Sequence, residues 1–147
     1  MALSRAYRQG AGFTLIELMV VVAIVAIIAA IAYPSYQSQV QASRRADGKS
    51  MLMQVMQAEE RYYTENYKYT TDLVGDLGLD GKGASGNNVL SDDEHYEISA
   101  AACGGGGIDE CVVLTATAQG PQAGDVCGNL TLDSRGNKTP QNPDECW

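Results

Sequence analysis

The sequence predicts an α+β fold in which one long amino-terminal helix packs on a small antiparallel β-sheet. Three observations support this prediction. An uninterrupted apolar run lies near the start, apolar residues at helical spacing follow it, and short strand-like runs separated by glycine-rich turns occupy the second half. The chain has 147 residues, which leaves room for one small globular domain besides the apolar run.

The apolar run covers residues 13–33 and contains a single charged side chain, Glu17. A helix of this length spans roughly 30 Å, the thickness of the hydrocarbon core of a bilayer. An acidic side chain in such a segment costs on the order of 2.5 to 3.5 kcal/mol on insertion scales. Glu17 therefore either reaches the headgroup region from the helix end, or has a partner that neutralises it.

The helical pattern continues beyond the apolar run. Pro34 predicts a bend, because proline removes a hydrogen bond from a helix interior. Beyond it, one stripe of residues recurs at spacings typical of a helix face that packs on other structure: Leu52, Val55, Met56, Glu59, Tyr62 and Tyr63. We expect one helix over residues 14–65, bent at Pro34 and locally softened by Gly48, whose second half packs on the sheet.

The second half of the chain alternates between turn-rich and strand-like composition. Residues 70–93 are rich in Gly, Asp, Asn and Ser and predict a loop. Strands are expected at residues 95–101, 111–118 and 128–134, and the turn "SRGN" after the third strand predicts a short return.

Charge is distributed unevenly along the chain. The first 12 residues contain Arg5 and Arg8 and no acid, whereas residues 13–147 carry eight basic and 18 acidic residues. Positive residues stay on the cytoplasmic side of membranes, so we expect the amino terminus inside and the acidic part outside. So acidic a domain repels nucleic acid as a whole, and nucleic-acid binding is not expected. The basic stretch "RRADGK" (44–49) is interpreted as a solvated helix surface, with anionic headgroups or DNA as alternative contacts.

Small residues precede the apolar run instead of following it, unlike an ordinary secretory signal. The stretch "GFTLIELMVVVAIVAIIAAIAYPSYQ" resembles the class III signal and amino-terminal helix of type IV pilins. This resemblance implies cleavage by a prepilin peptidase between Gly12 and Phe13, and N-methylation of Phe13. It also implies a removed leader at 1–12, a transmembrane and filament-core helix at 13–33, and an exterior head at 34–147.

The resemblance gives Glu17 a role in subunit assembly. Glu17 matches a family glutamate that pairs with the new amino group of Phe13 on an adjacent subunit, an attraction strengthened by low-dielectric surroundings. An intrachain pair is the alternative for the free monomer, because the two residues lie one helical turn apart. The stretch "AEERYYTENYKYTTDL" is similar to the helix end of PilE-type minor pilins.

Four cysteines, all in the last 45 residues, predict disulfides formed in an oxidising compartment. Of three possible connectivities, Cys103–Cys111 with Cys127–Cys146 is favoured because each joins local partners. The first pair closes a glycine-rich hairpin, and the second matches the disulfide-bounded carboxyl-terminal loop of the family. Zinc is disfavoured, because His95 is the only histidine and no C-x-x-C pair exists.

The expected function is that of a structural subunit, a minor pilin of a type IV pilus that supports assembly, twitching motility and adhesion. The alternatives are a DNA-uptake or adhesive ligand-binding pilin, a major pilin, and a type II secretion pseudopilin. Expected partners are the major pilin, other minor pilins, the prepilin peptidase/N-methyltransferase and an inner-membrane assembly platform. The subunit is expected in the inner membrane and then in the extracellular pilus. No catalytic motif, cofactor or metal site is expected; the acidic residues of 76–93 fit no calcium loop.

Overall fold

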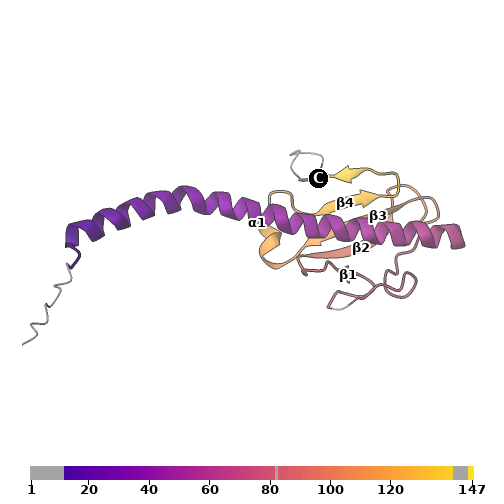
Figure 1. Ribbon diagram of the computed structural model, residues 1–147. Coiled ribbons are helices and arrows are strands. Elements are labelled where there is room, and N and C mark those ends of the chain that lie inside the picture. Colours follow the sequence, from indigo (N-terminus) through magenta and orange to yellow (C-terminus); the bar gives the residue numbers. More distant parts are fainter. Residues whose placement is uncertain (1–11, 82, 141–145) are drawn as a thin grey trace, which may run out of the picture. The chain divides into compact units, whose positions relative to one another are not determined.

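The computed structural model describes residues 12–81, 83–140 and 146–147. The elements follow the order α1 (Leu15–Asn66), β1 (Val89–Leu90), β2 (Tyr96–Ala102), β3 (Val112–Ala118), the short 3-10 helix η1 (Gly120–Gly124), β4 (Leu130–Asp133) and β5 (Lys138–Thr139) (Figure 1). The chain divides into two compact units, one ending at Ser38 and one running from Gln39 to Trp147. We call them the stem and the head.

The stem is the first part of α1, and every described residue in it is exposed. Helix α1 contains an 18-residue window with a mean hydropathy of 3.0, none of it buried, so it is long and apolar enough to cross a membrane. Exposed apolar side chains favour lipid or protein over water. Pro34 lies inside the helix close to the boundary between the units, and the bend expected there stays a prediction.

The head contains a five-stranded antiparallel sheet with the strand order β1-β2-β3-β4-β5. Its longest pairing joins β2 to β3 in a hairpin, with Tyr96 opposite Ala118 and Ala102 opposite Val112. Buried and more exposed residues alternate along β4 and through most of β2 and β3, as expected when one face of a sheet is covered. The predicted antiparallel sheet is therefore confirmed.

The head portion of α1 covers one face of this sheet (Figure 1). Leu52 and Val55 are fully buried in a core cluster that includes Ile98 and Leu114 from the strands. Gly48 permits the close approach, because a Cβ atom there would lie 2.6 Å from Cδ2 of Tyr96. Gly48 is thus a packing residue and not only the helix-softening position that the sequence suggested.

Strand β1 corrects the prediction of a continuous loop over residues 70–93. Val89 pairs with Ile98 and is fully buried, so two residues of that stretch extend the sheet. A two-residue strand is too short to show an alternating pattern in the sequence. The other predicted strands are confirmed to within two residues at each end.

Candidate functional site

Glu17 caps the start of α1. The Thr14 backbone N–H and hydroxyl both donate to Oε2 of Glu17, at 3.0 and 2.9 Å, and the Glu17 N–H donates to the Thr14 hydroxyl at 3.3 Å. This reciprocal arrangement is a capping box, whose sequence signature T-x-x-E was present in "TLIE". The sequence analysis missed this capping role: it considered only that Glu17 reaches the headgroups or pairs with a cation.

The capping box leaves part of the Glu17 carboxylate available. Its hydrogen bonds to the described residues all use Oε2, and Oε1 accepts none of them. Phe13 lies just before the helix with 90% of its side chain exposed. Gly12 is the first described residue; the leader assigned to residues 1–12 otherwise lies outside the described residues. The carboxylate can therefore cap its own helix and still face a cation from another chain.

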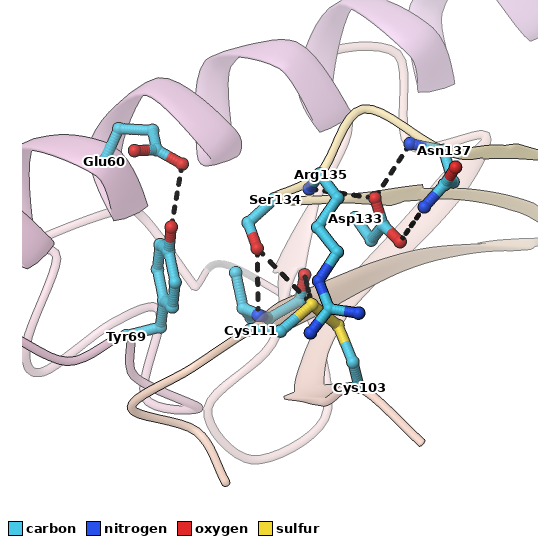
Figure 2. The surroundings of a disulfide bond; sticks show 9 residues. Glu60, Tyr69, Cys103, Cys111, Asp133, Ser134, Arg135 and Asn137 are labelled. Carbon is cyan, nitrogen blue, oxygen red and sulfur yellow. Dashed lines mark hydrogen bonds between the residues drawn. A yellow bond between two sulfur atoms is a disulfide. The ribbon is translucent and has the colours of Figure 1, made fainter. Parts of the chain in front are cut away.

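The Cys103–Cys111 disulfide closes the hairpin between β2 and β3, with a Cα–Cα distance of 5.4 Å (Figure 2). The Ser134 hydroxyl donates to Cys111 Sγ at 3.4 Å. Burial alone would raise the pKa of neighbouring Asp133, but hydrogen bonds from Asn137 and the Arg135 backbone lower it below its ordinary value. The hairpin end and the β4–β5 turn thus form one polar cluster.

The Cys127–Cys146 disulfide has a Cα–Cα distance of 5.7 Å, and together with the hairpin disulfide it gives the pairing that the sequence favoured. Residues 141–145 of the enclosed loop lie outside the described residues. Next to Cys146, the Trp147 indole N–H donates to the Thr139 carbonyl at 2.8 Å, and Lys138 Nζ lies 4.9 Å from the indole ring centroid. These contacts fix Trp147 against β5 and present its ring beside a cation.

Arg45 corrects the interpretation of residues 44–49 as a solvated surface. Its side chain is buried and donates to Asp125 Oδ1 at 2.7 Å, and the Asp125 side chain is also buried. The Gln122 amide donates to Asp125 at 3.0 Å and to the Tyr96 hydroxyl at 3.1 Å. This cluster joins α1, β2 and the η1 region; the sequence could not reveal it, because the charges are 80 residues apart.

Near that cluster, Lys49 and Lys138 form a positively charged surface. Burial lowers the pKa of Lys49, and the positive charges of Arg45 and Lys138 lower it further. Lys138 also lies over the Trp147 ring, and its charge acts on Lys49 strongly enough to lower the pKa of that amine. Lys138 is exposed and Lys49 partly so, which leaves both charges accessible to an anion. We call Lys49, Lys138 and Trp147 the basic patch.

A buried carboxylate marks the opposite end of the head helix. Glu59 is fully buried, and burial raises its pKa to about 7. The Thr70 N–H donates to its Oε2 at 3.1 Å. The sequence placed Glu59 on the packed stripe, but gave no sign that its charge would be enclosed.

The described residues bring one group of possible metal ligands together: Cys103, Cys111 and Asp133, whose ligand atoms lie within 4.8 Å of one another. Both cysteines are disulfide-bonded and therefore offer no thiolate. His95 borders a surface hollow of about 230 Å³ with Val40, Ser43, Arg44 and Asp93. Among the described residues no hydrogen bond joins Ser43 to His95 or His95 to Asp93, so the hollow does not show the oriented base that would activate a nucleophile.

The chain matches two family models. One, described as "Type IV minor pilin ComP, DNA uptake sequence receptor", matches residues 34–131. The other, the prokaryotic N-terminal methylation motif, matches residues 7–33. No curated protein sequence matches the chain significantly.

A solved structure shows the same fold. It is a type IV pilin from Shewanella oneidensis, 25% identical to this chain, with a TM-score of 0.51; the alignment covers 73% of this chain and 97% of that one. The long apolar helix, the antiparallel sheet and the two disulfides agree with the first family match, which covers two thirds of the sequence. The chain belongs to the ComP family of type IV minor pilins and is a structural subunit of a type IV pilus.

Proposed function

We propose that the subunit enters the filament through its stem, guided by a pair between the Phe13 amino group of one chain and Glu17 of its neighbour. The observation that carries this proposal is the stem, in which every described residue is exposed and the apolar helix has a single charge, Glu17, near its start. In a bundle of such helices the unpaired carboxylate is costly and the paired one is favourable, so the charge selects the register. The partners are other pilins, after processing by the peptidase and delivery by an assembly platform.

The proposal requires a free amino group at Phe13. We expect intact-mass spectrometry of the mature subunit to give a chain that begins at N-methylated Phe13. A variant with Gly12→Val, which places a branched side chain at the cleavage position, is expected to keep the leader. If the mature chain begins at any other residue, Phe13 has no free amino group, and the proposed pair with Glu17 cannot form.

A second function, DNA capture by the head, is supported by the name of the matched family model and by the basic patch. The overall negative charge argued against nucleic-acid binding, but exposed charges act over only about 8 Å at physiological salt, so a local positive surface can still attract a phosphate. The two lysines offer cations to phosphates, and Trp147 offers a ring on which a base or sugar packs. We infer that double-stranded DNA contacts the basic patch through its backbone.

The DNA proposal predicts a specific salt dependence. Changing Lys49 and Lys138 together to Gln should weaken binding of duplex DNA and reduce the slope of log Kobs against log salt by about 2, since each phosphate contact contributes about 0.9. Fluorescence anisotropy with the full chain in detergent measures both quantities. The matched control changes the exposed Arg61 and Lys68 to Gln, which removes the same net charge elsewhere. If both double variants lose the same DNA affinity, binding does not depend on the basic patch in particular.

A further inference from the structure

Glu59 is buried with only half of its carboxylate satisfied. The side chain has no exposed surface, and Oε2 accepts the Thr70 N–H at 3.1 Å. Oε1 is buried and has no hydrogen-bond partner in the described part of the chain. A buried carboxylate with an unpaired oxygen is much less costly when protonated than when charged.

The charged groups around Glu59 add to this cost. Within the described ranges, the charged groups that act on its carboxyl are Glu60 of the same helix and Asp76 of the following segment, and both are acidic. Tyr62 lies in the same environment, and its hydroxyl donates to Asp76 at 3.4 Å. The Thr70 hydroxyl donates to Asp76 at 2.6 Å, so the segment that contacts Glu59 also carries the repelling charge.

Several contacts attach the segment over residues 67–79 to the rest of the head. The Tyr69 ring stacks on Tyr63 with centroids 4.6 Å apart, and its hydroxyl donates to Glu60 at 3.1 Å. The Tyr69 N–H donates to the Ile108 carbonyl in the β2–β3 hairpin at 3.1 Å. The Leu73 N–H also donates to the Asn87 carbonyl at 3.2 Å, and Leu73 and Tyr69 are buried in the core. Among these attachments, the Glu59–Thr70 hydrogen bond is the one made by a buried carboxylate of α1.

We propose that Glu59 is a proton-operated latch: its neutral form holds residues 67–79 against α1, and its ionised form loosens them. The sign follows from the environment. Burial, helped by the acidic neighbours, raises the folded-state pKa of Glu59 from 4.5 to about 7, and the Thr70 N–H hydrogen bond, which favours the ionised form, offsets only part of this rise. The closed head therefore binds the proton more tightly than an open one, and closure weakens as pH rises through this window. The surface that loosens includes Tyr67, whose side chain is 81% exposed.

Amide hydrogen exchange of the full chain in detergent tests the latch. After correction for intrinsic exchange, the protection of the Thr70 amide should fall by roughly tenfold or more between pH 5.5 and pH 8. Glu59→Gln should abolish this fall, because the amide keeps the acceptor and cannot ionise. Glu65→Gln, an exposed change on the same helix, should behave like the wild type.

Two further readouts keep the proposal open to refutation. The Leu114 amide in the sheet core should retain its protection across the same range, which separates local loosening from global unfolding. The latch is refuted if Thr70 protection is independent of pH in the wild type. An equal fall in Glu59→Gln would refute it as well, because another group would then control the segment. Neither outcome depends on DNA binding or filament assembly.

Discussion

Changing Glu17 to Gln should reduce the amount of this subunit in assembled filaments by roughly tenfold or more, since 1.4 kcal/mol of lost pairing already gives that factor. Glutamine keeps the hydrogen-bond acceptor that Thr14 uses at the helix start, so the capping box survives. What disappears is the negative charge available to an adjacent amino group. Immunoblots of sheared filaments against the membrane fraction measure the ratio of incorporated to unassembled subunit.

The matched control separates capping from pairing. Thr14→Ala removes the cap, at a cost of about 1 kcal/mol, and leaves the Glu17 charge in place. We expect this variant to enter filaments almost normally, because a membrane surrounds the stem and favours its helix in any case. If Thr14→Ala and Glu17→Gln reduce filament incorporation to the same degree, the helix cap and not the charge would explain the requirement for Glu17.

The largest stability effect is expected at the buried ion pair of the head. Asp125→Ala should lower the free energy of unfolding by about 3 to 5 kcal/mol, because it leaves the Arg45 guanidinium buried without its partner at 2.7 Å. It also removes an acceptor from Gln122. Urea unfolding of the full chain in detergent, followed by fluorescence of the single tryptophan, Trp147, measures this loss.

A double variant tests whether the loss comes from an unpaired charge. Arg45→Met together with Asp125→Leu replaces both ions with apolar side chains of similar length, and it should recover most of the lost stability. Asp93→Ala, at an exposed position, should change stability by less than about 0.5 kcal/mol. A double variant no more stable than Asp125→Ala would show that shape, and not charge, makes this site sensitive.

The parts of the fold that depend on local pattern were predictable from the sequence. The helix was expected over 14–65 and runs from Leu15 to Asn66, because apolar periodicity reports directly which face is buried. Leu52 and Val55 on the predicted stripe are buried, while Gln54 and Gln57 are exposed. The three longer strands were predicted in the same way, from the composition of short strand-like runs. The two disulfides join neighbouring segments, so short separation was a sufficient guide.

The features that depend on long-range contact were not predictable. Arg45 looked like part of a solvated basic run, and only the folded chain brings Asp125 to it. The pairing of Lys49 with Lys138 in one patch has the same origin, since β5 lies almost 90 residues further along the chain. Charge summed over the sequence does not report where positive side chains gather, so the expectation that this chain does not bind DNA stays a prediction.

The disulfides have a mechanical consequence for a subunit that is pulled by its stem. They bridge separations of 8 and 19 residues. Fully extended chain reaches about 3.4 Å per residue and each bridge itself spans less than 6 Å, so these crosslinks withhold roughly 80 Å of backbone from stretching. Under tension the head can therefore lengthen only through the parts of the chain that lie outside these two disulfide loops.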